Sequence, residues 1–99
     1  MTRTAIHPGE ILADELDDLD LSAAELARLI DVPANRISQI LAGTRAISAD
    51  TALRLGWYFN TAPELWMNLQ KTYELDLARA EIGSDLERLP KRPVADAAR

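Results

Sequence analysis

The sequence contains no cysteine among its 99 residues. This excludes disulfide bridges and thiolate-bound metal ions as sources of stability, and it is compatible with a reducing cytosol. The chain also has no apolar run near the roughly 20 residues that a bilayer span requires, and its first ten residues lack the apolar core of a signal peptide. We therefore expect a cytoplasmic protein.

The residues that usually carry catalysis or hold metals are equally scarce. His7 is the single histidine, and no second group at suitable spacing accompanies it as a partner for acid–base chemistry. The segment from Asp18 resembles the start of a calcium loop, but Ala23 stands where the sharp turn needs glycine and Leu29 where the bidentate glutamate belongs. There is neither a glycine-rich phosphate loop nor a zinc-ligand spacing. The sequence predicts a protein that is not an enzyme and needs no cofactor or metal.

What is abundant is aliphatic residues at helical spacing. Hydrophobic residues make up 47% of the chain, aromatics only 5%, and leucine, isoleucine and alanine recur every three to four positions. This pattern predicts one all-α domain at residues 8–82, with an N-terminal arm at 1–7 and a partly disordered tail at 83–99. The expected helices are 8–18, 23–31, one that carries Ile37, Ile40 and Leu41 and stops at Gly43, one from Ser48 to about Phe59, and a longer one opened by a Thr61–Glu64 capping box and ended by Gly83.

The charges are divided between two regions. The net charge of −5 opposes DNA binding, because lysine and arginine contacts to phosphates supply most non-specific affinity. Residues 10–25, however, carry seven acidic residues and no basic one, whereas residues 28–54 carry four arginines against two aspartates. The acidic residues are Glu10, Asp14, Glu15, Asp17, Asp18, Asp20 and Glu25, and the arginines are Arg28, Arg36, Arg45 and Arg54. Two faces of opposite charge indicate two partners.

Residues 22–45 have the pattern of a helix-turn-helix. Two short helices are joined by a tight turn at Val32-Pro33, and the second is amphipathic. If its isoleucines face inward, 100° per residue places Asn35, Ser38, Gln39 and Ala42 outward with Arg36 at the shoulder. Asparagine and glutamine can bond adenine, and arginine can reach guanine or phosphate. The alternative is an ordinary solvated helix face.

The segment LSAAELARLIDVPANRISQILAGTRAIS resembles the Xre-type, lambda-repressor-like helix-turn-helix. The flanking segments HPGEILADEL and ISADTALRLGWYFNTAPELWMNLQKTYELDLA make the chain, over residues 6–90, similar to the HigA antitoxins of toxin–antitoxin operons. The resemblance implies a five-helix lambda-repressor-like domain that reads DNA bases through Ala34, Asn35 and Gln39. Ala23 and Pro33 depart from the glutamine and the capping serine or threonine usual in the family, so phosphate contacts fall to Ser22, Arg28 and local N–H groups.

Together these arguments predict DNA contacts by Ser22, Arg28, Ala34, Asn35, Arg36, Ser38, Gln39, Thr44 and Arg45. The resemblance further implies a homodimer that represses its own operon at a palindromic operator on the nucleoid, and that neutralises a HigB-like toxin, a RelE-type messenger-RNA endonuclease acting on the ribosome. The acidic first helix could face that toxin. We expect Trp66 and Leu69 to complete the core, and Tyr73, Leu77 and Ala80 on the last helix to contact a second copy.

Two other functions remain open at this point. One is a small repressor that has no toxin partner. The other is a toxin inhibitor that has lost DNA binding, which the acidic composition and Ala23 would fit.

Overall fold

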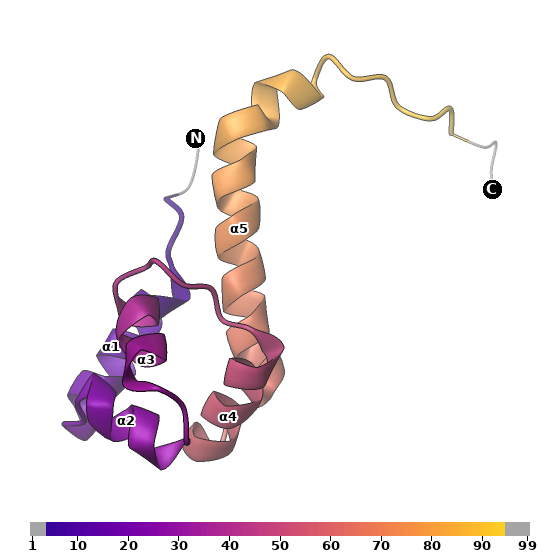
Figure 1. The fold of residues 1–99 in the computed structure, drawn as a ribbon. Helices are drawn as coiled ribbons and strands as arrows, with labels where there is room; N and C mark the ends of the chain where they lie inside the picture. The colour runs from indigo at the N-terminus through magenta and orange to yellow at the C-terminus, as the bar shows by residue number, and fades with distance from the viewer. Residues whose placement is uncertain (1–3, 95–99) are drawn as a thin grey trace.

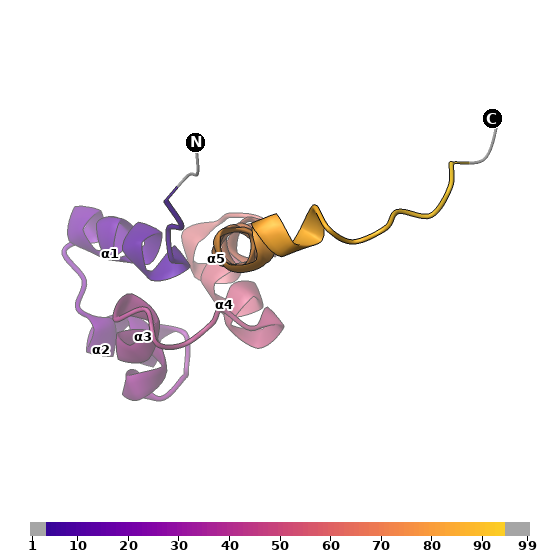
Figure 2. The same cartoon turned by 90° about the horizontal axis from the view of Figure 1, so that it is seen from above.

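The computed structural model describes residues 4–94, whose regular secondary structure consists of five α-helices (Figure 1). They are α1 (Pro8–Leu19), α2 (Ala23–Leu29), α3 (Ala34–Leu41), α4 (Ala49–Phe59) and α5 (Pro63–Leu86). Helices α1 to α3 cluster on one side of the base of α5, α4 lies against that base, and the far end of α5 extends beyond the cluster (Figures 1 and 2). The predicted all-α, five-helix fold is confirmed.

Polar side chains cap the start of three helices, α1, α2 and α4, the last through the Ser48 hydroxyl oxygen, which accepts from the Thr51 N–H. The Nδ1 atom of His7 accepts a hydrogen bond from the Gly9 N–H at 2.8 Å, and the His7 N–H donates to the Glu10 carboxylate at 3.2 Å. Ser22 and Glu25 form the predicted capping box at the start of α2. Because such caps satisfy N–H groups that have no partner inside the helix, they fix where each helix begins. His7 is thus the N-cap of α1.

One hydrophobic core joins the five helices. Its buried apolar side chains come from every helix and from the loop before α4, with Trp66 of α5 at 2% exposure. Leu69 packs against this core from α5, as predicted. The core consists of Leu12, Leu16, Leu26, Ala27, Ile30, Ile37, Ile40, Ile47, Ala52, Leu55 and Trp66.

Glycine permits two close approaches that set the frame of the domain. A Cβ added at Gly9 would overlap the Ile40 carbonyl oxygen and come within 2.9 Å of the carbonyl carbon, so α1 touches the backbone of α3 there. A Cβ at Gly56 would lie 2.8 Å from the Thr61 carbonyl oxygen, where the chain turns from α4 into α5. A residue larger than glycine at either position would force the neighbouring backbone to move.

Several predicted boundaries were wrong. Helix α2 ends at Leu29 rather than Asp31, because Val32 precedes a proline and the chain has already left helical geometry, with Asp31 at a φ of 59°. Helix α5 runs through Gly83 to Leu86, since a glycine costs a helix only about 1 kcal/mol relative to alanine. Thr61 does not cap α5: the cap position is Ala62, and the Thr61 hydroxyl oxygen accepts a hydrogen bond from the Trp66 indole at 3.2 Å.

The ends of the chain are described only in part. Residues 1–3 of the expected arm and 95–99 of the expected tail lie outside the described residues. Within the described range the arm ends in the buried His7, and residues 83–86 of the tail belong to α5. No helix within residues 4–94 combines the length and the apolar character needed to cross a membrane.

Candidate nucleic-acid interface

Helices α2 and α3 are joined by a tight turn and pack on each other through buried apolar residues. The Val32 N–H donates to the Ala27 carbonyl at 2.9 Å, and the Arg36 N–H donates to the Pro33 carbonyl at 3.0 Å as α3 begins. Leu26 and Ala27 of α2 and Ile37 and Ile40 of α3 are all buried. Their packing holds the two short helices in one rigid unit, as a helix-turn-helix requires.

The outward face of α3 carries short polar side chains. Asn35 and Ser38 are exposed, and Gln39 is half-buried, whereas Ile37 and Ile40 are completely buried. Ala34, at the first position of the helix, is also exposed. One helix of this size and polarity fits the major groove of DNA, which is about 12 Å wide. The structure therefore gathers the predicted base-reading side chains on one accessible surface.

The loop after α3 folds back onto Gln39. The Arg45 Nε atom donates to the Gln39 side-chain oxygen at 2.8 Å, and the Thr44 hydroxyl donates to the Gln39 carbonyl at 3.2 Å. The Arg45 bond orients the Gln39 amide, so that its NH₂ group remains as a donor. The three residues thus form one polar surface at the C-terminal end of α3.

The start of α2 is already occupied by its own cap. The Ser22 N–H donates to the Glu25 carboxylate at 2.8 Å, and the Ser22 oxygen accepts from the Glu25 N–H at 3.1 Å. The Glu25 carboxylate therefore brings negative charge to the place where a phosphate would approach Ser22. Arg28, exposed in the last turn of α2, is the cation nearest to this end in the sequence.

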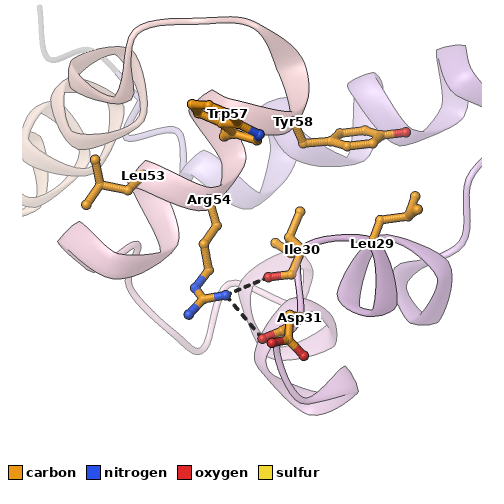
Figure 3. Close-up of a pocket in the computed structure, with 7 residues that line it drawn as sticks. All are labelled: Leu29, Ile30, Asp31, Leu53, Arg54, Trp57 and Tyr58. Carbon is orange, nitrogen blue, oxygen red and sulfur yellow. Dashed lines mark hydrogen bonds between the residues drawn. The ribbon is translucent and has the colours of Figure 1, made fainter.

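A network of ion pairs and hydrogen bonds that joins α3, α4 and the segment just after α2 was missed by the sequence reasoning. One carboxylate oxygen of Asp50, in the first turn of α4, accepts from Arg36 of α3 at 3.0 Å and from Arg54 at 2.8 Å. Arg54 also donates to the carbonyl oxygens of Ile30 and Asp31, at 2.7 and 3.2 Å, just after α2 (Figure 3). The spacing of Asp50 and Arg54 by four residues indicates a pair within one helix, but nothing in the sequence connects it to Arg36.

Two carboxylates near this interface are held ionised by their hydrogen bonds. The hydrogen bond from the Arg54 guanidinium is the largest cause of the lowered pKa of Asp50, and Arg36 lowers this pKa further. The Ser22 N–H and then its hydroxyl lower the pKa of Glu25. Both carboxylates are therefore fully charged at neutral pH.

Acidification should destabilise the domain through these two groups. Their pKa values are lower in the folded chain than the ordinary 3.8 of aspartate and 4.5 of glutamate. The stability they contribute is complete above those ordinary values and is lost as the pH falls through the lowered ones. We expect their contribution to the thermal midpoint to be constant from pH 7 to about 5 and to decline below about 4. The thermal midpoint of an Asp50→Asn/Glu25→Gln variant should fall less between pH 5 and 3 than that of the wild type. An equal fall in both proteins would contradict this assignment.

Two further surfaces lie away from α3. On α1 and just after it, Asp14, Asp17, Asp18 and Asp20 are all exposed. On the outer side of α4 and α2, Trp57 is 88% exposed and lies with Leu29, Leu53 and Tyr58 around a hollow of about 330 Å³ (Figure 3). We name these four residues the Trp57 surface. Leu53 of α4 thus faces outward.

The proposed dimer contacts on α5 differ in their surroundings. The Tyr73 ring is half-buried and makes a T-shaped contact with the His7 ring at a centroid distance of 4.8 Å, so part of it already packs within its own chain. Leu77 is 46% exposed and Ala80 is exposed, beyond the part of α5 that packs on the core.

Known proteins share this arrangement of helices. The helix-turn-helix family model matches residues 12–66, which is more than half of the chain. A HigA-family addiction-module antidote protein from Coxiella burnetii superposes with a TM-score of 0.89 at 47% identity, covering 92% of this chain and 100% of that one. The Pseudomonas aeruginosa antitoxin HigA, solved with the higBA promoter, gives 0.86 at 46% identity, with coverages of 92% and 100%. Virulence-associated protein I of Dichelobacter nodosus is 46% identical over 78 residues, 78% of this chain and 72% of that protein.

The class of protein is thus a DNA-binding helix-turn-helix regulator of the Xre type, which is not a class of enzymes. Within that class the chain belongs to the HigA antitoxin family. The predicted family and the prediction that the chain is not an enzyme are both confirmed.

Proposed function

We propose that this chain binds a palindromic operator in its own promoter as a homodimer and represses its operon. The observation that carries the proposal is the outward face of α3, where Asn35 and Ser38 are exposed on the side of the helix opposite the fully buried Ile37 and Ile40. A rigid helix with accessible amide and hydroxyl groups is what reading base edges requires. The HigA antitoxin of Pseudomonas aeruginosa, 46% identical, binds promoter DNA, which supports the same role here.

In this proposal Asn35 and Gln39 read bases, assisted by Ala34 and Ser38 and flanked by Arg36 and Arg45. Phosphate contacts come from Ser22, Arg28 and Thr44. Because the chain carries a net charge of −5, a single copy should bind weakly and with strong salt dependence. Two linked recognition helices raise the effective affinity, so operator binding should require the dimer.

We assign the dimer contacts to the outer part of α5, at Tyr73, Leu77 and Ala80. Exposed apolar area on a helix that extends beyond its own core supports this assignment. Recognition helices in such dimers reach major grooves roughly 34 Å apart.

We further propose that the chain neutralises a HigB-like toxin in the cytoplasm. The support is family membership together with the exposed carboxylates on α1 and just after it, at Asp14, Asp17, Asp18 and Asp20, which suit a basic partner. Charge complementarity there would accelerate encounter more than it would set the final affinity.

The test is to measure binding of the purified chain to its own promoter and to random DNA at several salt concentrations, and to purify the chain from its native operon. We expect tighter binding to the promoter and co-purification of a basic protein encoded next to it. Promoter binding without such a partner would identify a repressor that acts alone. A partner without promoter preference would identify a toxin inhibitor without operator binding.

A further inference from the structure

Residues 28–54 surround the proposed DNA surface, and Asp50 is one of only two acidic residues among them. A carboxylate in this region repels phosphates, so it opposes the DNA contacts proposed for its neighbours. Its position is nevertheless well defined, because one of its oxygens accepts hydrogen bonds from two arginines. This placement calls for a role that outweighs the repulsion.

Stability of the fold does not explain the position. The side chain of Asp50 is 58% exposed, and those of Arg36 and Arg54 are 28% and 38% exposed. Exposed ion pairs contribute only about 0 to 1 kcal/mol to folding, because water screens the charges and ordering the side chains costs entropy. What the network does determine is geometry.

The geometry links the three helices that build the interface. Arg54 bonds the two carbonyl groups that follow α2, at the point where Asp31 takes up a left-handed backbone conformation (Figure 3). The same Asp50 oxygen that accepts from Arg54 also accepts from Arg36, the third residue of α3. One carboxylate thereby ties the end of α2, the start of α3 and the start of α4 together.

We propose that Asp50 is a positioning residue for operator recognition: it holds the Arg36 guanidinium in one orientation at the edge of α3. This inference rests on the operator binding proposed above. An arginine fixed before binding loses less conformational entropy on contact with its target, and it cannot follow the phosphates of unrelated DNA as freely. Asp50 therefore improves discrimination between operator and random DNA, at some cost in total electrostatic attraction.

The test compares Asp50→Asn with the wild type for affinity to operator and to random DNA. The preference for operator, expressed as the ratio of the two dissociation constants, should fall about 3- to 10-fold, the effect of one rotamer-rich side chain that must now be ordered on binding. The matched control is Asp85→Asn, which removes the same charge from an exposed pair with Arg88 near the end of α5. That variant should leave the preference unchanged.

A double-mutant cycle with Arg36→Ala separates positioning from general destabilisation. If Asp50 acts through Arg36, Asp50→Asn should not lower the preference further in the Arg36→Ala background. An unchanged preference in Asp50→Asn, or an equal loss in both backgrounds, would overturn the inference while leaving operator binding intact. Absence of any preference in the wild type would instead refute the proposed function, and this inference with it.

Discussion

Replacing Asn35 and Gln39 together by alanine should weaken operator binding by about 30-fold or more. Each bidentate contact between such a side chain and a base contributes about 1–3 kcal/mol of discrimination, and two such contacts together give at least about 2 kcal/mol. Binding to random DNA should change little, since both side chains are neutral and non-specific affinity comes from phosphate contacts. Fluorescence anisotropy with labelled promoter and random duplexes measures both quantities.

The control for this variant is Asn68→Ala, which removes an exposed amide from α5. It should bind operator as the wild type does. Because Asn35 is exposed and Gln39 only half-buried, the double variant should keep its helical circular dichroism. Equal affinity of the double variant and the wild type for operator and for random DNA would refute the assignment of base reading to these two residues.

Replacing Trp66 by alanine should lower the free energy of unfolding by about 3–5 kcal/mol, the usual cost of removing a large buried aromatic side chain. Trp66 is 2% exposed, its ring packs near Phe59 at a centroid distance of 5.8 Å, and its N–H donates to Thr61. Since the free energy of unfolding of a small domain is only about 5–15 kcal/mol in total, this loss leaves the fold with marginal stability. Urea denaturation followed by circular dichroism measures the change.

The second tryptophan provides the comparison. Trp57 is 88% exposed, so Trp57→Ala removes almost no buried area and should change the free energy of unfolding by no more than about 0.5 kcal/mol. A similar loss in both variants would show that the Trp57 surface is covered in solution and that the free chain is not the species unfolding.

The fold was predictable where the sequence signals are local. The Ser22–Glu25 capping box, the proline after Val32 and the spacing of Ile37 and Ile40 each act within one or two helical turns. Prediction failed where packing decides between permitted alternatives. Gly83 permits a helix end but does not impose one, and Thr61 is equally suited to capping α5 or to accepting a bond from Trp66.

The interface was predictable in its exposed face but not in its internal bonds. The 100° rotation per residue identifies the outward side of α3 as soon as its isoleucines are placed inward. The bonds from Arg36 to Asp50 and from Arg54 to Ile30 join residues 14 and 24 positions apart. Their geometry depends on how α4 crosses the other helices, which no local pattern specifies.

The contact at Gly9 has a consequence for how such a protein can evolve. The position of α3 depends on α1 touching its backbone at Ile40, about thirty residues further along the chain, and a side chain at residue 9 would displace that helix. Asn35 and Ser38, in contrast, lie outside the core and contribute little to folding. Under the proposed base reading, substitutions at those two positions can therefore change the operator that is recognised at little risk to the fold, whereas position 9 has no such freedom. A diverging lineage can change which promoter it controls through a few surface substitutions while the frame that presents them stays fixed.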